Sequence, residues 1–293
     1  MRQNQIKERN LKKNPLFSYG GIHLEEDGIH IVIKSKTLSL VLDTKKGMAI
    51  ESLIFPETFS APLIVTVPQG YYQDNNFNAD FFSGHTTLDI PGLGKITDLS
   101  PVKPSYAISF FGGEKWLAIT GIITFDQGTL QKTVFVAVQS PKIKIEYVVS
   151  PLIPPRCSFR AGFMTFNPEV FDTRTLFYSC HNGGFKPDMF FFGTEAIHVH
   201  PVSFLVSSRR ALGNTSGILE VGDKSKTVTM AIEMDNYAAL PMLQFEKMLR
   251  SSTFFLRTKF SLQEFDDTTI KDRVSSRKPI VFRLTISAQK NNA

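Results

Sequence analysis

The stretch Lys142-Ile143-Lys144-Ile145-Glu146-Tyr147 decides the fold of this 293-residue chain, because apolar and charged side chains alternate in it without interruption. Successive side chains of a β-strand point to opposite faces of the sheet, so this pattern sets one face against a core and the other against water. Thr37-Leu38-Ser39-Leu40-Val41-Leu42 likewise has leucine at every second position. Both stretches predict half-buried strands.

A tight hairpin is expected after the second of these strands. Asp43-Thr44-Lys45-Lys46-Gly47 separates it from Met48-Ala49-Ile50-Glu51-Ser52-Leu53, and glycine stands where such a turn needs a positive φ. Strand character then recurs along the whole chain. The further expected strands are residues 30–33, 63–67, 106–111, 117–125, 130–138, 159–166, 197–206, 217–221, 228–233, 254–262 and 279–287.

The fold class follows from the number of strands. The only helix expected is Ala238–Leu249, and Pro241 weakens it. Strands without alternating helices argue against a parallel α/β fold, and no fixed repeat indicates a propeller or solenoid. We therefore predict an all-β chain that forms a large antiparallel β-sandwich. The proline-rich joint Ser150–Pro155 is interpreted as a rigid crossover between the halves of one sandwich.

The net charge of +6 is partly concentrated at the N-terminus. Without interleaved aromatic residues or a binding motif, this basic segment is interpreted as a solvated terminus, and no nucleic-acid partner is expected. We expect residues 1–28 to be a poorly ordered basic extension and residues 29–293 to form a single β-sandwich domain. The basic residues near the N-terminus are Arg2, Lys7, Arg9, Lys12 and Lys13.

Cysteine usage and hydropathy predict the compartment. The chain has two cysteines, Cys157 and Cys180, and no CxxC motif, which favours a reducing environment and structural thiols. The N-terminus lacks an apolar signal region, and no apolar run reaches the roughly 20 residues that span a bilayer. We therefore expect a soluble, cytoplasmic protein without a membrane partner.

The loop Asp74–His85 combines aromatic residues with Asp and Asn. Aromatic faces stack on sugar rings, while carboxylates and amides bind vicinal hydroxyls, so Asp80, Phe81 and His85 are expected to contact a saccharide. One alternative is a surface loop pinned by its phenylalanines. The other is an oxygen-rich calcium loop, although the spacing does not follow the EF-hand pattern.

Two histidine motifs follow in the second half. His181-Asn182-Gly183-Gly184 presents a polar pair on a turn whose glycines permit close approach to a ligand, and His181 can act as an acid or base near neutral pH; a capped turn is the alternative. His198-Val199-His200 places two imidazoles on one strand face. Three interpretations of this pair are open: a polar wall of a cleft, a structural pair, or half of a metal site. No further metal ligands are suitably spaced, so neither a metal nor a cofactor is expected.

An acid ends the strand-like run Thr227–Ile232. Glu233 stands at its end, Asp235 follows, and the loop closes at Pro241. In a β-sandwich this arrangement is expected to place the Glu233 carboxylate at a strand end that faces a cleft. GxSxG, GxGxxG, P-loop and HExxH motifs are all missing from the sequence.

Several of these runs resemble a known family. Leu38–Gly47 resembles the first hairpin of galactose-mutarotase-like supersandwich domains, and four other runs are similar to the β-sandwich region of glycoside hydrolase family 57. That family joins its sandwich to a catalytic (β/α)7 barrel, which this chain lacks because it has no βα repeats. The resemblance covers residues 30 to 290. The four runs are Asp80–His85, Phe166–Glu169, His181–Gly184 and Pro201–Val206.

The resemblance implies three functions that the residues leave open. The first is a carbohydrate-binding sandwich accessory to glucan metabolism, with a saccharide ligand and a separate glycoside hydrolase chain as partners. The second is an aldose 1-epimerase-like enzyme, in which Glu233 matches the catalytic base and His181 loosely matches the acid. The third is a structural sandwich without catalysis, so whether the chain is an enzyme stays open. The expected substrate contacts are Asp80, Phe81, His85, Asn182, His198, His200 and Asp235.

Overall fold

A computed structural model describes most of the chain. The described residues are 17–66, 82–90, 92, 94–126, 128–150, 158–181, 183–192, 205–206, 216–234, 239–247, 254–263 and 279–291. The helical elements among them are two short 3₁₀ turns, η1 (Thr44–Lys46) and η4 (Pro168–Val170). No helix in these ranges is long and apolar enough to cross a membrane.

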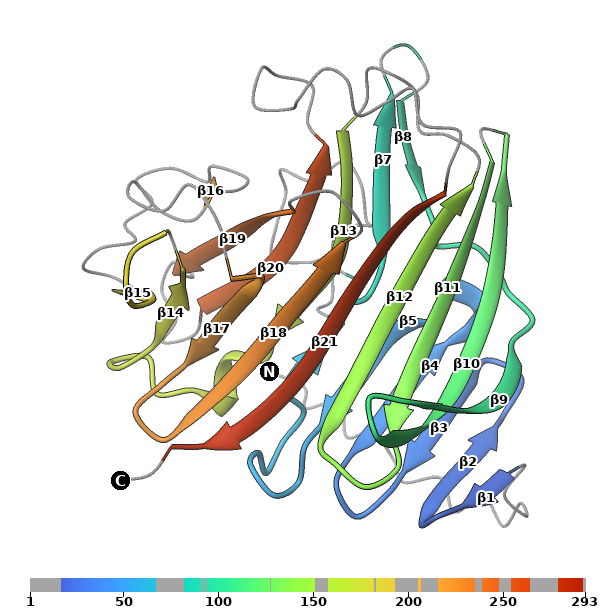
Figure 1. Ribbon diagram of the computed structural model, residues 1–293, viewed down its shortest axis with the longest axis horizontal. Coiled ribbons are helices and arrows are strands. Elements are labelled where there is room, and N and C mark those ends of the chain that lie inside the picture. The colour runs from blue at the N-terminus through green and yellow to red at the C-terminus, as the bar shows by residue number, and fades with distance from the viewer. Residues whose placement is uncertain are drawn as a thin grey trace, which may run out of the picture.

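Two antiparallel sheets lie face to face, and the core lies between them (Figure 1). Sheet A runs in the order β1-β2-β3-β4-β5-β6-β13-β20-β19-β16, and β7 joins β13 to β8. Its strands are β1 (Phe17–Tyr19), β2 (Ile22–Glu26), β3 (His30–Lys34), β4 (Ser39–Asp43), β5 (Ala49–Ile54), β6 (Ile64–Val65), β7 (Thr86–Ile90), β8 (Gly94–Thr97), β13 (Ser158–Phe166), β16 (Leu205–Val206), β19 (Leu240–Lys247) and β20 (Phe254–Gln263).

Sheet B runs in the order β15-β14-β17-β18-β21-β12-β11-β10-β9. Strand β21, the last in the chain, lies in the middle of this sheet between β18 and β12 (Figure 1). The strands are β9 (Ser105–Phe111), β10 (Glu114–Phe125), β11 (Gly128–Ala137), β12 (Lys142–Ser150), β14 (Phe177–Cys180), β15 (Asp188–Phe191), β17 (Ile218–Gly222), β18 (Lys226–Met234) and β21 (Ile280–Lys290). The predicted all-β sandwich is confirmed.

The alternation that predicted the strands also sets their faces. Ile143, Ile145 and Tyr147 on β12 are fully buried in the core, whereas Lys142 and Lys144 on the opposite face are partly exposed. The predicted hairpin between β4 and β5 is confirmed as well. Gly47 ends η1 with φ 61°, and a Cβ atom there would lie 1.8 Å from the carbonyl oxygen of Asp98, so only glycine fits.

The structure differs from two sequence expectations. Residues 17–28, assigned to the basic extension, carry β1 and β2, so sheet A begins before residue 29. The helix expected at Ala238–Leu249 is wrong, because residues 240–247 form β19, with Leu243 and Phe245 facing the core. Among the described residues, β16 pairs with Met242 and Leu243, so Pro241 lies outside the described part of that ladder.

A fully buried ion pair connects the two sheets. Lys132 on β11 contacts the Asp98 carboxylate at 2.5 Å, and both side chains have no exposed surface. The Lys132 ammonium also donates to the carbonyl oxygen of Gly47 at 2.7 Å, and Asp98 accepts from the backbone N–H of Thr86 at 2.8 Å. Burial raises the pKa of Asp98 and lowers that of Lys132, while the attraction between the two charges opposes both shifts.

Removing one partner of this pair should strongly destabilise the protein, because the other charge would remain buried without compensation. We expect Lys132→Met or Asp98→Asn to cost about 3–5 kcal/mol of unfolding free energy. Urea unfolding followed by circular dichroism measures this change. The exposed pair Arg174–Asp172, which is 3.0 Å apart, serves as the control, and its Asp172→Asn variant should change stability little. Equal stability of the buried-pair variants and wild type would contradict the role assigned to the pair.

Candidate functional site

Two cationic side chains lie on the face of sheet A that points away from the core. Leu256 and Phe260 on β20 belong to the core, so the alternating Arg257 and Lys259 point to the opposite face. Both are nevertheless only 1% exposed. Burial of two like charges next to each other is costly, which makes this part of the sheet a candidate for function rather than for stability alone.

A β-bulge in β13 places an aromatic ring under these cations. Ala161 pairs with Phe260 and Met164 with Thr258, so two residues of β13 lie opposite Lys259 alone. Gly162 adopts φ 65° there, and a Cβ atom would come within 2.9 Å of Leu284. The bulge lets Ala161 and Met164 both face the core, while Phe163 turns outward. The Phe163 ring lies 4.5 Å from the Arg257 guanidinium carbon and 5.3 Å from the Lys259 ammonium.

His85 is fixed against the same ring by the segment that precedes β7. The backbone N–H of Gly84 donates to the Phe163 carbonyl oxygen at 2.6 Å, and the Ser83 hydroxyl oxygen accepts from the Thr165 N–H at 2.9 Å. These bonds align the segment with β13. The His85 and Phe163 rings consequently stack with centroids 4.1 Å apart and planes 19° apart.

One carbonyl oxygen determines the tautomer of His85. The Phe82 carbonyl lies 2.5 Å from Nδ1 of His85 and also accepts from Nη2 of Arg257 at 3.1 Å. A carbonyl can only accept, so Nδ1 carries the hydrogen. Burial, reinforced by the positive charges of Arg257, Lys132 and Lys95, holds the pKa of His85 well below its usual value. The imidazole is therefore neutral, and its Nε2 carries a lone pair.

Nε2 of His85 and Oγ1 of Thr165 lack hydrogen-bond partners among the residues that the structure describes, and both side chains are completely buried. Thr165 pairs with Arg257 across the ladder, so its side chain is on the outward face too. Buried polar atoms are normally satisfied, and an exception calls for a ligand, water or ion. We name His85, Phe163, Thr165, Arg257 and Lys259 the β13–β20 cluster.

The cluster offers a complementary set of contacts to a hydroxylated ligand. Nε2 of His85 accepts a hydrogen bond, the Thr165 hydroxyl both donates and accepts, and the guanidinium and ammonium groups donate. The Phe163 ring is itself buried and is contacted by His85 and by the Arg257 guanidinium. No three His, Cys, Asp or Glu side chains in the described part of the chain are grouped to hold a metal ion.

The predicted catalytic residues lie elsewhere. Glu233 is on the outer face of sheet B, opposite Arg283 on β21, where its side chain is 56% exposed and contacts the Lys144 ammonium at 3.2 Å. His181 follows β14 at a turn in which the Gly183 N–H donates to its Nδ1 at 3.2 Å. His85 belongs to sheet A, so the core separates it from Glu233.

Glu233 and His181 are separated by one strand within sheet B. Strand β17 lies between β14 and β18, so the two residues are at least two strand spacings apart, about 10 Å. The structure thus does not bring Glu233, His181 and His85 into one pocket, and the acid and base roles remain predictions. The other predicted contacts, Asp80, Phe81, Asn182, His198, His200 and Asp235, lie outside the described residues.

Sequence reasoning missed four members of the cluster: Phe163, Thr165, Arg257 and Lys259. A signal for two of them was present in the strand Phe254–Leu262, where Arg257 and Lys259 alternate with apolar residues in a run otherwise typical of a core strand. The position of Phe163 could not be read from the pattern, because the bulge at Gly162 changes the face on which it lies.

Comparison with solved structures finds the family resemblance that the sequence predicted. A galactose mutarotase-like protein from Clostridium acetobutylicum is 11% identical, with a TM-score of 0.49, 94% of this chain covered and 100% of the other. An Escherichia coli K12 protein provisionally assigned as an aldose 1-epimerase is 8% identical, with a TM-score of 0.46, 92% of this chain covered and 100% of the other.

A third solved structure is similar over only part of its own length. The 4-α-glucanotransferase of Thermococcus litoralis is 9% identical, with a TM-score of 0.44; the likeness covers 94% of this chain but only 40% of that protein. At such identities and TM-scores, these likenesses say nothing about activity. No protein-family model and no curated protein matches the chain.

The neutral state of His85 should make stability depend on pH. The unfolded chain takes up a proton near pH 6.5 and the folded chain does not, so the unfolded state binds more protons and the unfolding free energy falls as pH drops below 6.5. His85→Gln should remove up to about 1.4 kcal/mol per pH unit of this dependence below pH 6.5. Urea titrations at several pH values measure it. An unchanged slope in the variant would show that His85 is protonated in the folded state.

Proposed function

We propose that this protein is a carbohydrate-binding β-sandwich whose saccharide ligand binds at the β13–β20 cluster. The observation that carries the proposal is the pair of buried atoms without described partners, Nε2 of His85 and Oγ1 of Thr165. Leaving such atoms unsatisfied costs about 1–3 kcal/mol each, and a ligand that bonds to them recovers that free energy on binding.

A saccharide matches the chemistry of the cluster. Each sugar hydroxyl can donate one hydrogen bond and accept others, so one hydroxyl can donate to Nε2 of His85 while another bonds to the Thr165 hydroxyl. The N–H groups of Arg257 and Lys259 can donate to hydroxyl oxygens.

Valine at position 165 provides the sharpest test, because it keeps the shape of threonine and removes only the hydroxyl. We expect Thr165→Val to weaken binding of glucose, galactose or maltooligosaccharides about tenfold in isothermal titration, since one hydrogen bond is lost. The melting temperature of the free protein should stay the same or rise, because an unsatisfied buried hydroxyl has been removed.

Thr258→Val is the matched control. Thr258 precedes Lys259 on β20 but faces the core, where its hydroxyl contacts the Met230 sulfur at 3.4 Å. This variant should lose some stability and keep its affinity. The proposal is wrong if no saccharide binds at millimolar concentration, or if Thr165→Val binds as tightly as wild type. Sugar phosphates, run in parallel, show whether the two cations select a charged ligand.

The catalytic alternative retains Glu233 as the base and His181 as the acid of an epimerase-like reaction. Polarimetry with glucose and galactose tests it directly, because an enzyme accelerates mutarotation above the buffer rate. Loss of a general base typically costs about 10²–10⁴ in rate, so Glu233→Gln should abolish any acceleration that depends on this carboxylate. Full activity in Glu233→Gln, combined with loss in His85→Gln, would move the base to the β13–β20 cluster.

A further inference from the structure

A second candidate site lies on the other sheet. A groove of about 490 Å³ crosses the outer face of sheet B, away from the core, over β14, β15, β17, β18 and β21. Its volume falls within the usual range for small-molecule sites. The side chains that line it are Thr175, Phe177, Met189, Phe191, Glu220, Asp223, Lys224, Thr227, Gln289 and Asn291.

The floor of the groove is apolar and accessible. Phe177 is buried at the bottom, and Phe191, its partner across the β14–β15 ladder, is 43% exposed. The two ring centroids are 6.3 Å apart and the planes are inclined by 64°. Met189, 50% exposed, extends the same surface. The edge-on contact with buried Phe177 fixes the orientation of the partly exposed Phe191 ring.

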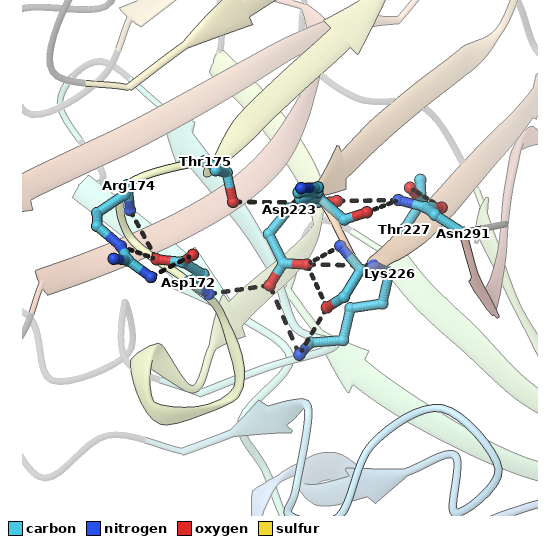
Figure 2. A network of polar contacts seen from close by, with 9 residues as sticks. Asp172, Arg174, Thr175, Asp223, Lys226, Thr227 and Asn291 are labelled. Atoms are coloured by element: carbon cyan, nitrogen blue, oxygen red, sulfur yellow. Dashed lines mark hydrogen bonds and ion pairs between the residues drawn. The ribbon is translucent and has the colours of Figure 1, made fainter. Parts of the chain in front are cut away.

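One wall of the groove is held in place by hydrogen bonds centred on Asp223, in the turn between β17 and β18 (Figure 2). The Asp223 carboxylate accepts from the backbone N–H groups of Asp172 and Ser225, at 2.9 and 2.7 Å. Burial opposes its ionisation, but these bonds outweigh that effect, and the pKa of Asp223 is lowered. The Asn291 amide donates to the Asp223 carbonyl oxygen and accepts from the Thr227 hydroxyl. The wall is therefore preorganised.

The charges of the groove cancel. Glu220 and Asp223 are acidic, Lys224 is basic, and Lys226 lies 3.5 Å from the Asp223 carboxylate. A groove without net charge does not favour an ionic ligand. Its apolar floor, together with the amide of Gln289 and the carboxylate of Glu220 at the rim, suits a neutral molecule that is apolar on one face and hydroxylated at its edges.

We propose that this groove binds a neutral saccharide ring, stacked on Phe191, independently of the β13–β20 cluster. A pyranose has C–H groups on its faces and hydroxyls around its edge, which matches the floor and the rim. The two sites lie on different sheets with the core between them, so each can be occupied without the other.

Titration of four proteins and one control variant with maltoheptaose tests this inference. The proteins are wild type, Phe191→Ala, Thr165→Val and the double variant. Phe110→Ala is the matched control, because Phe110 is also an exposed phenylalanine on sheet B, at 68%, but lies on the opposite edge strand β9. We expect wild type to bind two ligands, Phe191→Ala to weaken one of them about tenfold, and Phe110→Ala to behave as wild type.

The outcomes separate the two sites. A tight site that survives in Thr165→Val and is weakened about tenfold in the double variant supports the groove. If Phe191→Ala binds as wild type while Thr165→Val is weakened, the groove is overturned and the proposed function stands. If Phe191→Ala is weakened while Thr165→Val binds as wild type, the groove is supported and the site proposed at the β13–β20 cluster is overturned. Gln289→Ala changes the exposed rim of the groove and should also lower the affinity for maltoheptaose. It takes the place of Phe191→Ala if the Phe191→Ala variant does not fold.

Discussion

The buried contact between Lys132 and Asp98 is the constraint on which the arrangement of the two sheets depends. Sheet B supplies the lysine, and the residues that follow β8 and η1, Asp98 and Gly47, are its partners, so the pair sets the relative position of the layers at one point. Burial of both charges is costly, and such a pair fixes one arrangement because a shifted one would leave two charges unpaired. The β7 segment that contacts Asp98 also carries His85, and the position of the candidate site therefore depends on the same constraint.

A single extra residue in β13 determines which of its side chains face the core and which face the candidate site. Because Gly162 tolerates a positive φ, β13 can present Ala161 and Met164 to the core and still turn Phe163 outward. Without the bulge, strict alternation would place Ala161 and Phe163 on the same face. The ring that Arg257, Lys259 and His85 contact is thus a product of local backbone geometry as much as of side-chain chemistry.

Much of the fold could be predicted from local patterns, and the rest could not for physical reasons. The alternation in Lys142–Tyr147 and the glycine at position 47 identified strands and a hairpin because those signals are local. The prediction of a helix over residues 240–247 was wrong because the few apolar residues there fit both the helical period of about 3.6 residues and the strand period of 2. His85 was predicted from its loop, but Arg257 and Lys259 were not, since the face of a strand depends on pairing with residues far away in the sequence.

The central position of β21 has a consequence for how the protein is made. Strands β9–β12 form a meander from consecutive hairpins, and β17 pairs with β18 locally, yet in the described part of sheet B the two groups meet through residues 280–290 alone. During synthesis the ribosome must release this segment before sheet B can close. Until then, β12 and β18 each expose an unpaired edge, which is the state most open to capture by chaperones and to association with other nascent chains.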